Sequence, residues 1–167
     1  RERLNAPMAD LEGTIAAYGS GLARVAASYE ADRALQEDLL QDILLAVHRA
    51  LPSLKREERL APFVFRIAHN RSVTHVMQQS ARRLRAVPAS FEDETETPEQ
   101  LLLADESSRR VAAAVRRLPL PYRQVMTLLL EELSYAEIAE ALGLSLSNVG
   151  VRVNRAKALL KALLDDE

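Results

Sequence analysis

The amino-acid sequence has no cysteine among its 167 residues. This absence excludes a disulfide framework and a thiolate metal site, and it suits a reducing compartment. No apolar run approaches the length needed to span a bilayer, and the N-terminus shows no signal-peptide pattern. We therefore expect a cytoplasmic protein without membrane insertion. Residue 1 is arginine, so whether further sequence precedes it stays open.

The patterns that an active site requires are missing as well. No glycine-rich phosphate loop and no nucleophile-base pair is visible, so we expect no enzymatic activity and no cofactor. His48, His69 and His75 have neither i,i+4 spacing nor a suitably placed carboxylate, and we expect no metal site. Strand-like alternation of apolar and polar residues is also absent, which predicts an all-α fold.

The charged residues that are present are strongly segregated. The formal net charge is -2, from 22 Lys and Arg against 24 Asp and Glu. Residues 59–91 contain arginines but no acid, residues 143–164 contain cations but no acid, and residues 92–106 contain acids but no base. Local patches govern attraction to nucleic acid, so this pattern predicts two cationic surfaces separated by an anionic connector.

Apolar periodicity predicts a series of amphipathic helices. The expected helices cover residues 11–29, 33–51, 63–85, 101–118 and 122–133, with Pro52 ending the second and Pro62 starting the third. Residues 86–106 are acidic and proline-containing, as in a linker without its own core. We therefore predict two small helical domains, residues 1–85 and 107–167, joined by an acidic linker at 86–106.

Residues 134–155 predict a helix-turn-helix. Ser134 and Glu137 have the spacing of a capping box, Gly143 is suited to end the first helix, and Ser145 or Ser147 can cap the second. An ordinary helix pair with a solvated basic face is the simpler alternative. The positions expected to face inward are Ile138, Ala139, Leu142, Val149, Val153 and Ala156. The outward face carries hydrogen-bond donors for DNA at Ser147, Asn148, Arg152, Asn154, Arg155 and Lys157.

Three segments resemble the extracytoplasmic-function (ECF) sigma factors of bacterial RNA polymerase. Residues 37–42 are similar to an E-D-L-x-Q-D/E helix, and residues 65–70 resemble a Y/F-R-I-A-x-N pattern. Residues 118–156 are similar to the family's L-P-x-x-Y/F-R segment and the helix-turn-helix that follows it. The three segments occur in the family's order, with an acidic linker between the second and third.

This resemblance implies that the partners are core RNA polymerase and promoter DNA, with an anti-sigma factor as a further candidate. The implied contacts with the polymerase clamp are Glu37, Asp38, Gln41 and Asp42. For melting at the -10 element the implied residues are Arg66, His69, Asn70, Arg71, His75, Arg82 and Arg83, together with the loop at 53–60. The last helix would read the -35 element, and residues 92–106 would follow the RNA path.

The sequence departs from the family's usual pattern at two places. After Asn70 the family usually has an acidic residue and then a dense basic run, whereas here the cations arrive only at Arg82, Arg83 and Arg85. Gly150 and Val151 occupy positions where the family often has Lys and Ser. Either Gly150 lets the helix backbone approach DNA closely, or the substitution is neutral drift.

Two other functions compete with a sigma factor. A sigma-like decoy would titrate an anti-sigma partner without initiating transcription, and the depleted -10 segment favours it. A helix-turn-helix repressor would use its N-terminal helices to dimerise or to sense a ligand. The repressor explains neither the linker nor the acidic residues at 37–42, although those acids could be no more than a solvated helix face.

Overall fold

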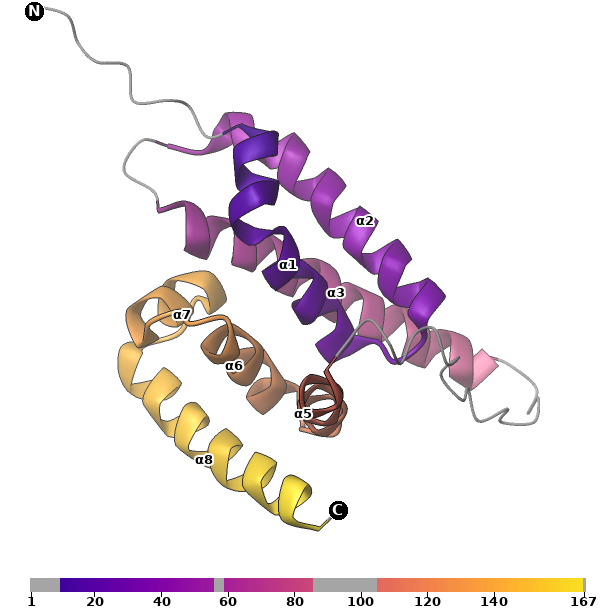
Figure 1. Ribbon diagram of the computed structural model, residues 1–167. Helices are drawn as coiled ribbons and strands as arrows, with labels where there is room; N and C mark the ends of the chain where they lie inside the picture. The colour runs from indigo at the N-terminus through magenta and orange to yellow at the C-terminus, as the bar shows by residue number, and fades with distance from the viewer. Residues whose placement is uncertain (1–9, 56–58, 86–104, 167) are drawn as a thin grey trace, which may run out of the picture.

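The computed structural model describes residues 10–55, 59–85 and 105–166, and every regular element within these ranges is a helix. The all-α prediction is therefore confirmed. None of the described helices is both long and apolar enough to cross a membrane. The elements are α1 Leu11–Tyr29, α2 Arg33–Ala50, the 3-10 turn η1 Leu51–Ser53, α3 Leu60–Arg85, α5 Glu106–Arg116, α6 Leu120–Leu130, α7 Tyr135–Leu142 and α8 Leu146–Asp165 (Figure 1).

Side-chain caps set where the first two helices begin. The Asp10 carboxylate accepts a hydrogen bond from the Gly13 amide at 2.8 Å, and Asp32 accepts one from the Leu35 amide at the same distance. Each cap satisfies an amide that has no partner inside the helix. Both helices begin where their apolar stripes predict.

Two helices begin earlier than predicted, for one shared reason. α3 begins at Leu60 rather than Phe63, and α6 begins at Leu120 rather than Tyr122. In each case a proline, Pro62 or Pro121, lies inside the first turn. Amides there have no intrahelical acceptor, so a proline costs no hydrogen bond and does not mark the boundary.

The first three helices form one group around a shared core. Leu22 and Val25 of α1, Ile43 of α2 and Val64 of α3 are almost fully buried. The rings of Tyr18 and Phe65 meet edge to face, with centroids 5.9 Å apart. The apolar stripe at positions 11, 15, 18, 22, 25 and 26 predicts that Ile15 faces this core, but Ile15 is 41% exposed. Thr14 is buried one position earlier, so the inward face of α1 is rotated in its first turn.

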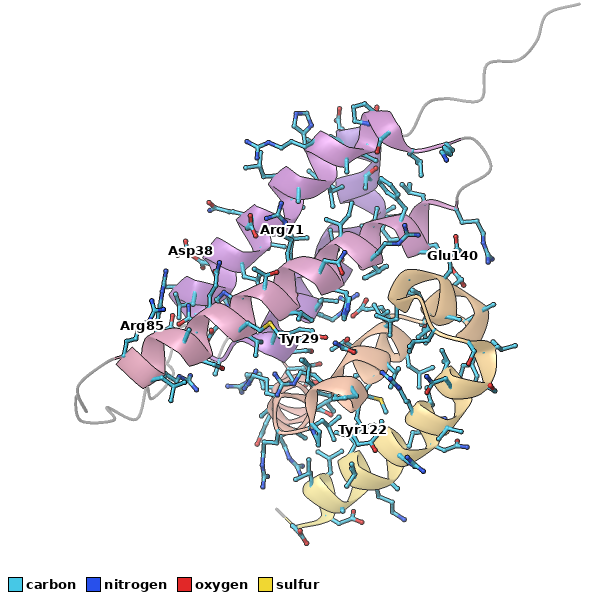
Figure 2. All side chains as sticks on the ribbon, turned by 180° about the vertical axis from the view of Figure 1, so that it is seen from behind. Tyr29, Asp38, Arg71, Arg85, Tyr122 and Glu140 are labelled. Carbon is cyan, nitrogen blue, oxygen red and sulfur yellow. The ribbon has the colours of Figure 1, made fainter. Side chains whose placement is uncertain are left out.

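The last four helices form a second group, and it packs directly against the first. α6 and α7 both contact α8, α5 and α6 contact α1, and α7 contacts α3. Figures 1 and 2 show α2 on the side of the first group away from this second group. Buried residues from both groups, among them Tyr29, Val115 and Leu133, belong to one continuous hydrophobic cluster.

Candidate nucleic-acid interface

The helix-turn-helix forms as its local sequence predicts. The Ser134 hydroxyl accepts from the Glu137 amide at 3.1 Å, and the Glu137 carboxylate accepts from the Ser134 amide at 3.2 Å. Gly143 ends α7 with φ of 67°, the left-handed conformation that glycine adopts without steric cost. Ser145 caps α8 by accepting from the Asn148 amide at 3.2 Å. The cap is thus Ser145 and not Ser147.

The two faces of α8 divide as the periodicity requires. Val149, Val153 and Ala156 are fully buried against the rest of the second group. On α7, Ile138 and Ala141 are buried, and the predicted Ala139 and Leu142 are partly buried and pack against the core. The six predicted DNA contacts of α8 all reach the surface: Ser147, Asn154, Arg155 and Lys157 are exposed, and Asn148 and Arg152 are half-buried.

Arg152 is held by its own helix. Its Nε donates to the Asn148 carboxamide oxygen, one turn earlier, at 3.2 Å. That contact fixes the inner nitrogen of the guanidinium and leaves the two terminal nitrogens for a forked contact. A fork of two parallel donors is the geometry that matches guanine or a phosphate.

The acidic positions on α2 form an exposed surface. Glu37, Asp38, Gln41 and Asp42 all lie in solvent, opposite the buried Leu39 and Ile43. Glu37 accepts from Arg33 at 3.3 Å within the helix. Asp42 lies 3.7 Å from Arg71 of α3, so one acid of this surface is next to one of the cations predicted for the -10 element.

The predicted -10 residues on α3 fall into three environments. Asn70, Arg71, Arg82 and Arg83 are exposed, whereas Arg66 and His69 are half-buried. Burial lowers the pKa of His69, which favours its neutral ring. His75 is mostly buried, with Nε2 2.7 Å from the Glu30 carboxylate. Among these seven residues, only His75 has a buried carboxylate partner of this kind within the described chain.

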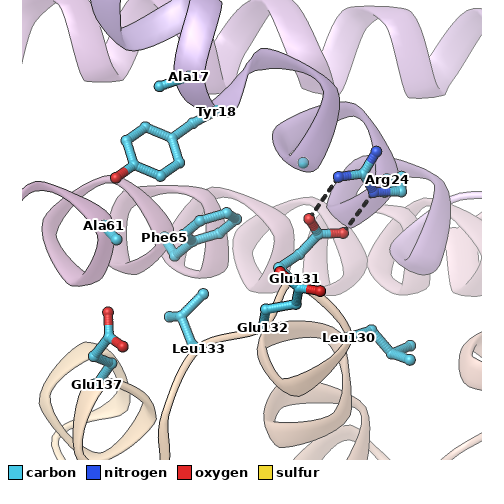
Figure 3. A pocket seen from close by; sticks show the side chains of 11 residues that line it. Ala17, Tyr18, Arg24, Ala61, Phe65, Leu130, Glu131, Glu132, Leu133 and Glu137 are labelled. Atoms are coloured by element: carbon cyan, nitrogen blue, oxygen red, sulfur yellow. Dashed lines mark hydrogen bonds and ion pairs between the residues drawn. The ribbon is translucent and has the colours of Figure 1, made fainter.

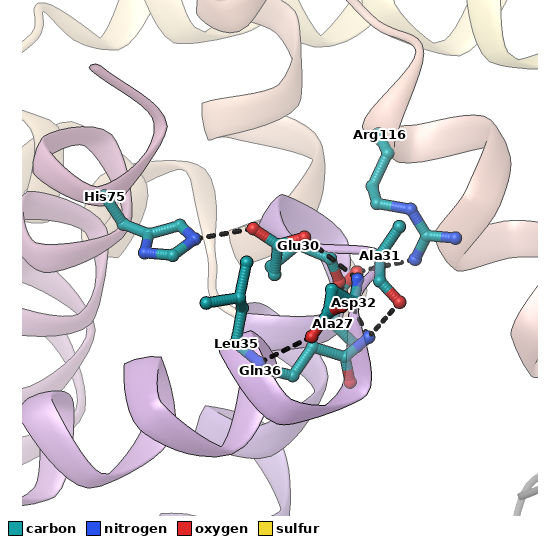
Figure 4. Close-up of polar contacts among 8 residues, drawn as sticks. All are labelled: Ala27, Glu30, Ala31, Asp32, Leu35, Gln36, His75 and Arg116. Carbon is teal, nitrogen blue, oxygen red and sulfur yellow. Dashed lines mark hydrogen bonds and ion pairs between the residues drawn. The ribbon is translucent and has the colours of Figure 1, made fainter. Parts of the chain in front are cut away.

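Glu30 organises the junction where α1 ends, a role that the sequence analysis missed. Its second carboxylate oxygen accepts from the Asp32 amide at 2.9 Å, and its carbonyl accepts from Gln36 at 2.7 Å. Arg116 of α5 donates to the nearby Ala27 carbonyl at 2.7 Å. Figure 4 shows these contacts converging on one turn. A lone Glu after an apolar stripe gives no sequence signal for such a role.

A second contact between the two groups lies at the turn joining α6 and α7. Glu131 accepts two hydrogen bonds from the Arg24 guanidinium of α1, both at 2.8 Å, and its side chain is only 8% exposed. A Cβ at Gly21 would lie 2.7 Å from a Glu131 oxygen, so glycine makes room for this carboxylate. Figure 3 shows the pair at the edge of a cavity of about 440 Å³, whose lining includes Tyr18, Phe65 and Leu133.

The described residues offer no cluster of three or more His, Cys, Asp and Glu that could hold a metal ion. Recognition of other macromolecules by surface charge and hydrogen bonding requires exposed polar side chains. The exposed surfaces suited to it are the outer face of α8, the acidic face of α2 and the cationic second half of α3.

Comparison with known proteins gives two family matches. The Sigma-70 region 2 family matches residues 14–93, and the Sigma-70 region 4 family matches residues 108–160. The ECF RNA polymerase sigma-E factor of Escherichia coli K12 is 30% identical over 131 residues, which cover 72% of this chain and 69% of that protein. The RNA polymerase sigma factor SigZ of Bacillus subtilis is 27% identical over 135 residues, covering 80% and 75% of the two chains.

A solved structure agrees over almost the whole chain. The structure of CnrH in complex with the cytosolic domain of CnrY has a TM-score of 0.69 at 27% identity. The match covers 94% of this chain and 88% of that one. CnrH is an RNA polymerase sigma factor of Cupriavidus metallidurans.

Proposed function

The chain belongs to the ECF family of RNA polymerase sigma factors, and we propose that three consecutive parts divide its work in promoter-specific initiation. Residues 1–85 bind core polymerase and open the -10 element. Residues 86–106 form the acidic connector, most of which lies outside the described residues. Residues 107–167 bind the -35 element. We propose that the protein acts in the cytoplasm, beside the polymerase and the chromosome.

The acidic face of α2 is the proposed contact with core polymerase. Asp38 and Asp42 are exposed and lie one helical turn apart, so a single cationic groove can meet both. Like-charge juxtaposition across an interface costs several kcal/mol, which makes charge reversal a sharp test of this contact.

The proposed -10 surface lies along α3. Exposed Arg82 and Arg83 can follow the displaced strand by phosphate attraction, and half-buried Arg66 and His69 lie nearer the core. Arg71 lies beside Asp42, and His75 is bound to Glu30. Each of these side chains must therefore separate from a carboxylate before it contacts DNA. We assign the first contacts with DNA to the exposed arginines.

The outer face of α8 is the observation that carries the proposal. It presents Arg152, Arg155 and Lys157 without a single acid between residues 143 and 164, on a helix whose opposite side is fully buried. A helix of this kind enters the major groove as the second element of a helix-turn-helix. A decoy that binds only a protein partner does not require a cationic reading face.

Run-off transcription separates the sigma factor from the decoy. With core polymerase and genomic fragments, the chain is expected to give specific transcripts, and Asp38→Arg with Asp42→Arg is expected to abolish both transcripts and core binding. Asp165→Arg with Asp166→Arg makes the same change in charge at the exposed last residue and C-cap of α8 and serves as the control. Absence of transcripts from a chain that still binds an anti-sigma protein would establish the decoy.

Alanine variants of the two outward arginines test the -35 assignment. If Arg152 reads a guanine, Arg152→Ala costs about 1–3 kcal/mol and relaxes preference at one position, whereas loss of a phosphate contact at Arg155 weakens all sequences and lowers the salt slope by about one. If Arg155 reads the base and Arg152 contacts the phosphate, the two variants exchange these results. The measurement is holoenzyme binding to -35 duplexes across a salt series. Unchanged affinity in both variants would remove α8 as the reader.

A further inference from the structure

Two consecutive residues in the middle of the outer face of α8 are poor helix formers and carry no hydrogen-bonding side chain. Gly150 lies three residues after Ser147 and four before Asn154, so it is central to the proposed reading surface. Val151 is 48% exposed beside it. Glycine inside a helix lowers stability relative to alanine, and β-branched valine does so to a smaller degree.

The fold itself does not require glycine at position 150. A Cβ built there meets no atom within 4 Å, and the residue has no positive φ. Gly21 and Gly143 differ, because one makes room for Glu131 and the other ends α7 in a left-handed conformation. An alanine at position 150 would therefore fit the free protein and would strengthen the helix.

The chemistry of the surrounding residues indicates which feature of a base edge fits beside Gly150 and Val151. Ser147, Asn148, Asn154 and Arg155 around Gly150 and Val151 are polar or cationic, whereas Leu146, one turn before Gly150, is apolar and 58% exposed. Arg152 is held back toward Asn148 by the hydrogen bond at 3.2 Å. At Gly150 and Val151 the surface therefore has a small uncharged patch between its hydrogen-bonding groups. In the major groove, the apolar feature of a base edge is the C5-methyl group of thymine.

We infer that Gly150 and Val151 read a thymine in the -35 element, with the missing side chain at 150 admitting the base edge and the Val151 methyls contacting its C5-methyl group. This inference rests on the proposed role of α8. It adds specificity for a T·A pair by apolar contact, next to the forked arginine contact. A Lys and a Ser at these positions would offer the groove a charge and a hydroxyl instead.

Uracil substitution tests the contact directly, because deoxyuridine differs from thymidine only by this methyl group. The full chain in holoenzyme is used to select -35 elements from a random duplex pool, and each thymine of the selected element is then replaced by uracil. One replacement is expected to weaken binding by the parent about threefold to fivefold, the value of one buried methyl group. The same replacement is expected to have no effect on Val151→Ala. Leu159→Ala, at an exposed apolar position two turns further along α8, keeps the parent's response.

Gly150→Ala supplies a second test, in which stability and DNA affinity are expected to change in opposite directions. Its melting temperature is expected to rise by about 1–4 °C, because alanine favours the helix. Its affinity for the selected duplex is expected to fall about fivefold or more, because the new methyl group occupies the close approach. A variant that is both more stable and weaker in binding is not explained by damage to the fold.

Several results would overturn the inference while leaving the proposed function in place. These are an element selected without thymine, a uracil scan that is identical for the parent and Val151→Ala, and a Gly150→Ala variant that keeps full affinity or loses stability. The arginine variants separately test whether α8 binds the -35 element at all. If Arg152→Ala and Arg155→Ala both retain affinity, the assignment of the -35 interface to α8 is itself wrong.

Discussion

At the scale of single residues, Tyr29 shows how a side chain near the end of α1 depends on the second helical group. The residue is 5% exposed, and the Arg123 guanidinium lies 5.6 Å from its ring centroid. Burial raises the pKa of Tyr29 to about 12, although Thr127 and Arg123 oppose the shift. The same loss of water lowers the pKa of Arg123. A ring that reads as one more apolar position on a stripe therefore stacks against a cation from the other half of the chain.

This shift predicts a loss of stability in alkali. Between about pH 10 and pH 12 the unfolded chain gives up the Tyr29 proton while the folded chain keeps it, so stability is full below pH 10 and falls as pH rises. Tyr29→Phe is expected to lose less stability than the parent between pH 9 and pH 11, measured by urea unfolding. Tyr135→Phe, at an exposed position, controls for the loss of a hydroxyl. Equal alkaline losses in all three proteins would contradict the assignment.

At the scale of helices, sequence signals succeeded where the determinants are local. Ser134 and Glu137 are three residues apart, and Gly143 acts through its own backbone, so the bounds of α7 could be predicted from a few positions. The starts of α3 and α6 could not be predicted in this way, because a proline within the first turn is compatible with helical residues before it. The prediction that Ile15 is buried was wrong for a tertiary reason, because the rotation of the first turn of α1 depends on the helices packed against it.

The α7 cap gives the prediction for this scale. Ser134→Ala is expected to cost about 1 kcal/mol of unfolding free energy, because the Glu137 amide loses its acceptor. Ser134→Asp restores an acceptor near the positive end of the helix and should recover most of that loss. Urea unfolding of the three proteins measures both effects. If the aspartate variant is as unstable as the alanine variant, the hydroxyl contact at 3.1 Å is not what stabilises the helix start.

At the scale of the whole molecule, the contact between the two helical groups was outside the reach of the sequence. Arg24 and Glu131 are 107 positions apart, and neither lies on an apolar stripe. Periodicity predicted each group's core but not that one cluster would run through both. The exposure of the candidate residues on α2 and α8 was more accessible to prediction, because charges on an otherwise apolar helix mark its outer face directly. The pairing of His75 on α3 with Glu30 left no such signal, and the roles of all these residues stay predictions.

A continuous core predicts that the described helices unfold together. Val25 of α1 is 2% exposed and lines a cavity with Val111 of α5 and Thr127 of α6, so Val25→Ala removes contacts from both groups at once. We expect a loss of about 2 kcal/mol and a single calorimetric transition, whose calorimetric and van't Hoff enthalpies agree. Glu131→Ala should lower the midpoint less, because Arg24 is 62% exposed and can return to water. Two separated transitions, with only the first shifted by Val25→Ala, would mean that the groups fold independently and that their contact is a weak docking.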